Sequence, residues 1–285
     1  MSSQTLAIIF GLAAALSWGA GDFSGGVAAK RSPVYGVVIV SQLAGLLLLG
    51  SLAVLLSEPI PRPIDFLWGA VAGIAGGLGL LALYRGLATG RMGVVAPVNA
   101  VVSAAVPVLW GAFLEGPPAP SQLLGFAVAL VAVWLVSRTG DGKGVQGRDL
   151  GLPFLAGLGF GLFLIAIDHV SDTAILWPLV ATKIAAVAML LPVVARMRPG
   201  GAHPGGMRIA RQLPLIALAG ILDSGGNALY ALAARAGRLD VAAVLSSLFP
   251  AVTVLLARLV LKEAVSRPQW LGVAAARAAV ALIAS

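Results

Sequence analysis

The chain contains no cysteine and few charged residues. Without cysteine it has no disulfide, no thiolate metal site and no covalently attached haem. Charged residues make up 11% of its 285 positions, whereas soluble domains carry roughly 25%. So few charges leave too little polar surface to keep a chain of this length in water, and a soluble enzyme is therefore excluded.

Apolar residues take the place of the missing charges. Hydrophobic residues fill 59% of the positions, and a further 36 are glycine. A helix needs about 20 apolar residues to cross a hydrocarbon core of about 30 Å, so this content suffices for about ten crossings. A transmembrane β-barrel is excluded because its strands alternate polar and apolar residues, whereas the apolar runs here are unbroken. The net charge of +8 therefore indicates basic loops on one side of a membrane, and we expect no nucleic-acid partner.

Charges, prolines and short polar runs separate ten apolar segments of membrane-spanning length. We predict an all-α integral membrane protein whose ten transmembrane helices lie at 6–28, 34–56, 66–87, 93–114, 122–136, 150–167, 174–195, 213–234, 241–261 and 270–284. The connections 137–149 and 196–212 are predicted to be longer polar loops. Asp65, Asp149 and Asp240 each stand just before an apolar run and are predicted to cap the following helix.

The two halves of the chain repeat one another. The corresponding residues keep the same order in both halves, as Gly90-Arg91 with Gly237-Arg238, Asp22 with Asp168, and Tyr84 with Tyr230. We therefore predict two five-helix repeats, residues 1–137 and 150–285, joined by the polar connection 138–149. Because five is odd, the second repeat enters the membrane from the opposite side. Inverted repeats of this kind are typical of secondary transporters that work by alternating access.

Lysine and arginine gather in the connections on one side of this arrangement. That side holds Lys30, Arg31, Arg91, Arg138, Lys143, Arg148, Arg196, Arg198, Arg208, Arg211, Lys262 and Arg267, and the other side holds Arg62, Arg235 and Arg238. Basic loops stay in the cytoplasm. We therefore predict a multi-pass protein of a bacterial-type inner (plasma) membrane with both termini outside the cytoplasm.

Two patterns carry a resemblance to a known family. The first predicted span contains Ser17-Trp18-Gly19-Ala20-Gly21-Asp22-Phe23. Each half closes with a span that contains Pro, ends near Glu and is followed by Gln and Gly, namely Pro107, Glu115, Gln122 and Gly125, then Pro250, Glu263, Gln269 and Gly272. The sequence resembles the EamA-type, ten-helix transporters of the drug/metabolite transporter (DMT) superfamily, in particular bacterial exporters of amino acids, aromatic ones included.

This resemblance implies a transporter with no enzymatic activity and no cofactor. It also implies that the first, third, fourth, sixth, eighth and ninth helices surround a central cavity, with the fifth and tenth peripheral. The sequence departs from the family in three places. Asp22 stands where Asn is common, Gly116-Pro117-Pro118 follows Glu115, and Arg277 lies inside the last span.

Asp223 is the ionisable residue placed deepest in a predicted span, where a charge needs a partner or a watery cavity. Helical spacing puts Gly220, Asn227 and Tyr230 on the same face. Asp223 with Asn227 is predicted to contact a substrate ammonium, or Asp223 to carry a coupling proton. The alternative is a structural ion pair with Lys183 or Arg277. Lys183 aligns with Gln42 of the second span, and we expect it to bridge helices.

Other polar and aromatic residues on the predicted spans complete the set of candidates. The further cavity candidates are Trp18, Asp22, Tyr84, Asn99, Ser103, Phe163, Tyr230 and Ser247, and the predicted gates or hinges are Pro97, Pro107 and Pro250. Asp22 and Asp168 are placed near matching ends of the first and sixth spans, where gating and helix-end solvation both remain open. Glycines such as Gly79 and Gly159 are predicted to let the third and sixth spans pack closely. We expect no metal site.

Together these features predict a secondary transporter that exports small metabolites, most specifically amino acids including hydrophobic and aromatic ones. The alternatives of the same fold are a transporter of drugs or organic cations and one of sugar phosphates or nucleotide sugars. A phosphorylated substrate would need paired basic residues in the cavity, and Lys183 lies on a span expected to be peripheral. An intramembrane enzyme and a passive channel are alternatives of other classes. The partners expected are a small-molecule substrate and the lipid bilayer, with monomer and dimer both open.

Overall fold

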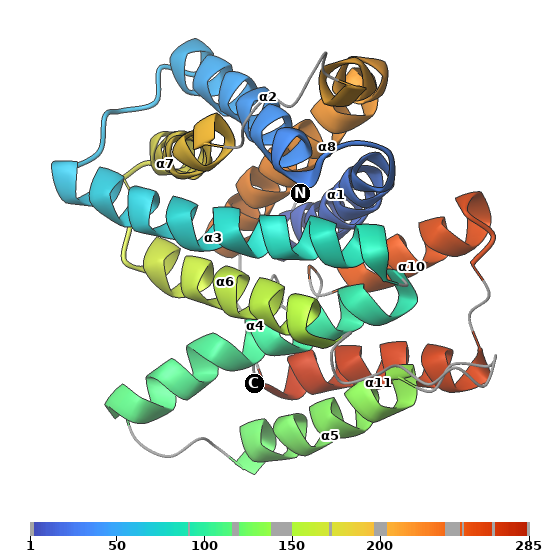
Figure 1. Cartoon of the computed structure of the whole chain (residues 1–285). Helices are drawn as coiled ribbons and strands as arrows, with labels where there is room; N and C mark the ends of the chain where they lie inside the picture. The colour runs from blue at the N-terminus through green and yellow to red at the C-terminus, as the bar shows by residue number, and fades with distance from the viewer. Residues whose placement is uncertain are drawn as a thin grey trace.

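A computed structural model of the chain describes residues 3–90, 92–115, 120–137, 150–170, 173–196, 204–236, 246, 248–263 and 266–283. Within these residues it contains ten helices of 12 to 33 residues and no strand. In chain order the helices are α1 (Ser3–Arg31), α2 (Val34–Leu55), α3 (Pro63–Thr89), α4 (Met92–Glu115), α5 (Pro120–Ser137), α6 (Gly151–Asp168), α7 (Leu176–Arg196), α8 (Pro204–Ala236), α10 (Phe249–Val260) and α11 (Arg267–Ile283) (Figure 1). The prediction of an all-α fold with ten helices is confirmed.

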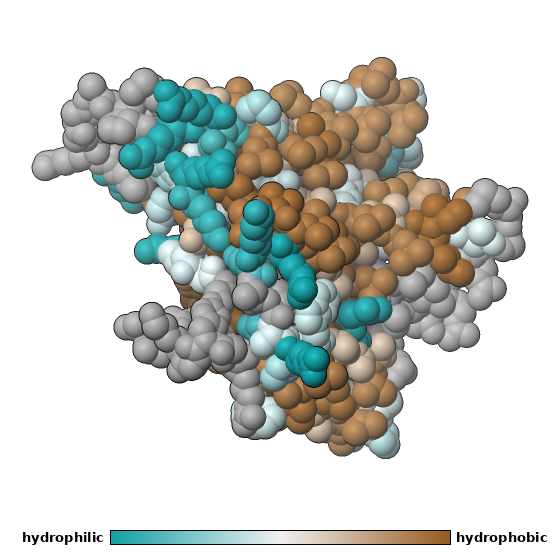
Figure 2. Space-filling view, turned by 90° about the vertical axis from the view of Figure 1, so that its right-hand side faces the viewer, coloured by the Kyte–Doolittle hydropathy of each residue, from teal (hydrophilic) through white to brown (hydrophobic). Residues whose placement is uncertain are grey.

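The outside of the bundle is apolar, as a lipid-facing surface requires. By length and composition, α1, α2, α3, α6, α7 and α8 could each cross a membrane. Large hydrophobic side chains such as Leu16, Leu47 and Leu130 are well exposed. Figure 2 shows hydrophobic residues over most of one described face and hydrophilic residues gathered on one side of it. These features, with the unbroken apolar runs, make the chain a multi-pass membrane protein.

One of the predicted connections needs correction. The polar loop predicted over 196–212 is shorter, because α8 already begins at Pro204; the charged residues of its first turns extend the helix beyond its apolar stretch. Proline is accepted there because the first helical N–H groups have no partner within the helix. The ninth predicted span began at 241; of this span the structure describes helical residue 246 and α10, which begins at Phe249, and residues 241–245 and 247 lie outside the described part of the chain.

Asp65 caps α3, but from within the helix. It is the third residue of α3, and its Oδ2 accepts a hydrogen bond from the backbone N–H of Arg62 at 3.1 Å. The Arg62 guanidinium also donates to Asp65, and this hydrogen bond, with the negative charge beside it, raises the pKa of Arg62. Asp65 therefore caps the helix as predicted, but as its third residue, because α3 begins at Pro63 and not at residue 66. Asp149 and Asp240 lie outside the described residues.

The bundle is arranged so that equivalent helices of the two repeats run antiparallel. Glu58 follows α2 and accepts backbone hydrogen bonds at the beginning of α7, from Ile175 at 2.8 Å and from Trp177 at 2.9 Å. The end of the second helix of one repeat thus meets the start of the second helix of the other. The two repeats are therefore inverted, as the odd helix number required.

Glycine sets the distance between α3 and α6, which lie side by side in Figure 1. A Cβ added to Gly159 would lie 2.7 Å from the Cα of Gly79, so the two backbones cross with no room for a side chain. The close packing predicted for these glycines is present. α5 and α11 pack against each other and against α4, away from α2 and α7 (Figure 1).

Candidate functional site

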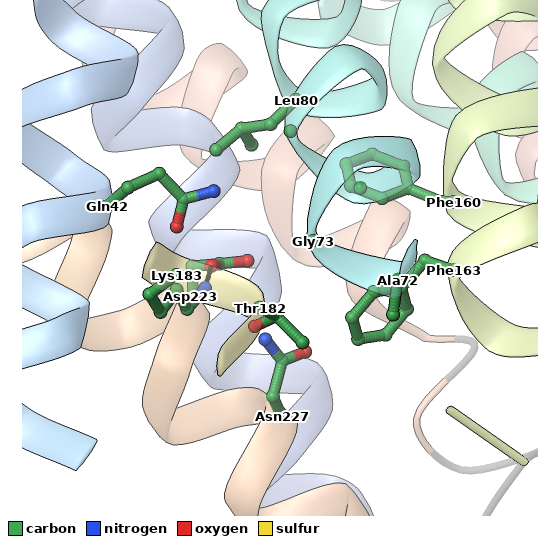
Figure 3. A pocket seen from close by; sticks show the side chains of 12 residues that line it. Gln42, Ala72, Gly73, Leu80, Phe160, Phe163, Thr182, Lys183, Asp223 and Asn227 are labelled. Atoms are coloured by element: carbon green, nitrogen blue, oxygen red, sulfur yellow. Dashed lines mark hydrogen bonds and ion pairs between the residues drawn. The ribbon is translucent and has the colours of Figure 1, made fainter. Parts of the chain in front are cut away.

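A cavity opens among five helices of the bundle, α2, α3, α6, α7 and α8. Its empty space is about 340 Å³, including the part open to the outside. It is lined by Gln42, Ala72, Gly73, Gly76, Gly77, Leu80, Phe160, Phe163, Thr182, Lys183, Asp223 and Asn227. Figure 3 shows the two Phe rings of α6 across the cavity from Lys183 and Asp223.

An ion pair forms one wall of this cavity. Lys183 Nζ on α7 donates to Asp223 Oδ2 on α8 at 2.6 Å, and the two side chains are only 4% and 19% exposed. Neither group could stay charged alone in a membrane interior at low cost, but together they are neutral. Of the two candidate partners for Asp223, the structure selects Lys183. Arg277 is exposed on α11, a helix that packs against α5 and α4.

The resemblance implied that Lys183 lies on a peripheral helix, but the structure places it in the lining of the cavity. Both α7 and its counterpart α2 reach the cavity, through Lys183 and Gln42. These are the two residues that the repeat aligned with each other, so the inversion brings equivalent positions to one site. The matching faces differ in chemistry, because α8 presents Asp223 and Asn227 where α3 presents glycines and Leu80. The cavity is therefore polar on one side and apolar on the other.

Asn227 is held by an aromatic cluster behind the cavity wall. Its Oδ1 accepts a hydrogen bond from Trp18 Nε1 at 3.1 Å. The Trp18 ring packs against Tyr230, with ring centroids 5.6 Å apart, and against Phe249 at 6.2 Å. Trp18 and Tyr230 thus support the wall, whereas Phe163, with Phe160, lines the cavity directly. Because the amide oxygen is engaged, the amide nitrogen of Asn227 is left as the donor on this side.

Asp22 lies elsewhere than predicted. The sequence placed it near the end of the first span, but α1 continues to Arg31 and buries Asp22 in its interior at 9% exposure. Its counterpart Asp168 is the last residue of α6 and is exposed. The two aspartates therefore do not form a matched pair at the edges of the membrane.

The other predicted site residues lie outside the lining of the cavity. Tyr84 is fully buried in the hydrophobic core, and Asn99 is buried on α4; within the described structure Asn99 Oδ1 has no hydrogen-bond partner. Ser103 donates to the carbonyl of Ala100 in its own helix at 3.0 Å. Ser247 lies outside the described residues.

The three prolines fall in two structural contexts. Pro97 and Pro107 lie inside α4, where each interrupts the helical hydrogen-bond ladder as predicted. Pro250 lies in the first turn of α10, where a missing N–H costs nothing. Residues 237–245 and 247, which precede it, lie outside the described part of the chain, so the role of Pro250 as a gate or hinge stays a prediction.

Sequence reasoning missed Phe160 and Thr182 in the cavity and Glu58 at the start of α7. Phe160 could have been found, because it precedes Phe163 by one helical turn and shares its face. Glu58 had no local signal, since the helix it caps begins more than a hundred residues later.

Comparison with known proteins decides the family. The model of the EamA-like transporter family matches residues 5–138 and 150–285, nearly the whole chain in two stretches. This chain belongs to the EamA-like transporter family. Its members are membrane transporters of the DMT superfamily and not enzymes, so this EamA-like protein is a membrane transporter.

Structural comparison agrees on the fold. A solved structure described only as a crystal structure of a protein superposes on this EamA-like chain with a TM-score of 0.64 at 18% identity, covering 97% of this chain and 95% of its own. At that identity the likeness concerns the fold alone. No curated protein matches the sequence.

Proposed function

We propose that this EamA-like transporter exports zwitterionic amino acids, including those with aromatic side chains. The observation that supports this is the Lys183–Asp223 ion pair in the cavity wall. An amino acid carries the same two charges. Its ammonium can replace Lys183 at Asp223 while its carboxylate takes the freed Lys183, so every buried charge keeps a partner during the exchange.

The rest of the cavity fits the side chain of such a substrate. Phe160 and Phe163 face the ion pair from α6, and Leu80 adds apolar surface from α3 (Figure 3). Aromatic pairs in edge or offset contact gain about 0.5–1.5 kcal/mol beyond their buried area, which favours aromatic substrates over small ones. The Asn227 amide nitrogen is the remaining donor for the substrate carboxylate.

The inverted repeats supply the means of movement. We take residues 1–137 and 150–285 as the two repeats and 138–149 as their connection, in agreement with the two stretches that match the family model. The cavity is lined by equivalent helices of the two repeats, α2 with α7 and α3 with α8. Exchange of the two repeat conformations would open this site to one side and then to the other, which is alternating access.

The orientation follows from basic residues at one end of the bundle. Lys30 in the last turn of α1 lies 3.3 Å from Glu263 after α10, so both helix ends lie on one side, with Arg31 and Lys262 next to them. By the positive-inside rule this side is cytoplasmic, which places both termini on the other side of an inner (plasma) membrane. Export is then movement away from the side of Lys30.

The alternative substrates fit less well. A sugar phosphate or nucleotide sugar brings at least two negative charges, and among the described lining residues Lys183 is the one cation and is already paired with Asp223. An organic cation would have to displace Lys183 from Asp223 and leave its ammonium without a partner. A zwitterion avoids both costs.

Counterflow in proteoliposomes tests this function. Labelled phenylalanine outside should accumulate in vesicles loaded with unlabelled phenylalanine, and Lys183→Gln and Asp223→Asn should each reduce this uptake strongly. Arg277→Gln, which alters an exposed charge on a peripheral helix, serves as the matched control. Uptake of a sugar phosphate or an organic cation with no uptake of any amino acid would contradict the proposed substrate class and leave the family assignment intact.

A further inference from the structure

Asp22 is a buried carboxylate outside the substrate cavity. It lies inside α1, is 9% exposed, and forms no hydrogen bond or ion pair with any described residue. The helix packs tightly against α8 at this point, because a Cβ on Gly21 would lie 3.2 Å from the backbone N of Asp223. A second carboxylate, that of Asp223, is therefore close to Asp22 in the interior of the bundle.

Few titratable groups face Asp22. From α8 it interacts electrostatically with Asp223, and from α3 with the buried hydroxyl of Tyr84. From α10, Thr253 donates to the carbonyl of Gly19 and does not titrate. No titratable group in the described parts of α2 and α10 interacts with Asp22. Among the described residues, Asp22 thus has an acid and a phenol beside it and no cation of its own.

The charges of this region do not balance if both carboxylates are ionised. Lys183 lies 2.6 Å from Asp223 and neutralises it, so an ionised Asp22 would leave one unpaired negative charge inside the membrane, which is strongly unfavourable. A proton on Asp223 would not solve this, because it would break the ion pair and leave the Lys183 ammonium next to a neutral acid. A proton on Asp22 leaves the region neutral with the ion pair intact.

We propose that Asp22 is the proton-carrying residue of this transporter, protonated in the conformation described here and ionised when movement of α1 against α8 exposes it to water. Its carboxylate takes up one proton on one side and releases the same proton on the other, so that one proton enters for each substrate exported. Asp223, which the sequence suggested for this role, then serves the substrate ammonium. The coupling rests on the proposed export function, whereas the protonation of Asp22 does not.

Infrared spectroscopy tests the protonation without any substrate. The purified transporter at neutral pH should show the carbonyl stretch of a protonated carboxylic acid, shifted in D₂O, and Asp22→Asn should remove that band. Asp168→Asn, the same change at an exposed carboxylate, should keep it. If Asp22→Asn does not fold, Asp22→Glu should move the band to the position of a glutamic acid. Absence of the band in the wild type, or its persistence unchanged in either Asp22 variant, would overturn the proposal.

A pH gradient tests the coupling. In proteoliposomes a gradient that is acidic on the side receiving the substrate should accelerate phenylalanine movement by the wild type relative to counterflow without a gradient. In Asp22→Asn this acceleration should be lost, whatever the counterflow rate. An unchanged ratio of the two rates in Asp22→Asn, or acceleration by a sodium gradient in its place, would overturn the coupling. If no amino acid moves at all, the infrared result still decides the protonation.

Discussion

Lys183 Nζ and Asp223 Oδ2 lie 2.6 Å apart in the wall of the cavity. Of the ion pairs between described residues, this one lies inside the bundle, whereas Lys30–Glu263 and Arg62–Asp65 lie at helix ends. A buried pair is mutually dependent, because each partner removes the cost of burying the other.

The first prediction concerns the stability of this pair. Asp223→Asn leaves the Lys183 ammonium buried without its carboxylate, and loss of one partner from a buried pair costs about 3–5 kcal/mol. The double variant Lys183→Gln with Asp223→Asn leaves no charge unpaired and should unfold at a higher temperature than Asp223→Asn alone. A double-mutant cycle on thermal unfolding in detergent measures the difference; additive single effects would show that the two residues are not coupled.

The second prediction concerns the support behind Asn227. Trp18→Phe keeps a ring against Tyr230 and Phe249 but removes the N–H that donates to Asn227. An unsatisfied acceptor costs about 1–3 kcal/mol when it is fully buried and less at Asn227, which is partly buried, so we expect a slightly lower unfolding temperature and weaker binding of phenylalanine. Trp110→Phe, at an exposed position on α4, should change neither, and equal effects of the two substitutions would contradict this role of Trp18.

The third prediction concerns Glu58, which joins the two repeats at one end. Its carboxylate accepts N–H groups from three successive residues at the start of α7. Loss of a helix N-cap costs about 0.5–2 kcal/mol, so Glu58→Ala should destabilise the protein and speed hydrogen exchange of the amides of Ile175 and Trp177.

Glu263→Gln provides the comparison for Glu58. It breaks a partly exposed ion pair with Lys30, and such pairs contribute about 0–1 kcal/mol. Exchange at the start of α7 should therefore stay as in the wild type. Unchanged exchange in Glu58→Ala as well would show that α7 does not depend on this cap.

The fourth prediction concerns the contact of α3 with α6. Gly159→Ala places a Cβ 2.7 Å from the Cα of Gly79, and because that atom is backbone the helices must separate. Overpacking of this kind costs about 1–3 kcal/mol. Gly50→Ala in α2 has no atom within 4 Å of the new Cβ and should stabilise the protein slightly, by about 0.4–1 kcal/mol. Thermal unfolding of the two variants should shift in opposite directions.

Much of the fold could be predicted because each helix has a local signal in the sequence. Unbroken apolar runs mark the ten helices, and the internal repeat with its odd helix number predicts the inversion that Glu58 now shows at the ends of α2 and α7. The polar stripe of α8 also pointed to Asp223 and Asn227, both of which line the cavity.

What sequence could not supply was contact between distant helices. Lys183 and Asp223 are separated by 40 positions, and the sequence of neither helix indicates whether Asp223 pairs with Lys183 or with Arg277. Asp22 was misplaced because the helix ended later than its apolar run, with Lys30 and Arg31 still helical. The partner of Asp223 and the burial of Asp22 both depend on tertiary packing, which the periodicity of a single helix does not indicate.

The most direct test of the central claim, that the ion pair binds a zwitterion, is competition during phenylalanine counterflow by two analogues that each carry one of its charges. Phenethylamine retains the ammonium and 3-phenylpropionate the carboxylate, and both retain the ring. If Lys183 and Asp223 exchange partners with the substrate, unlabelled phenylalanine will compete strongly and neither analogue will. Competition by either analogue equal to that of phenylalanine would contradict the account.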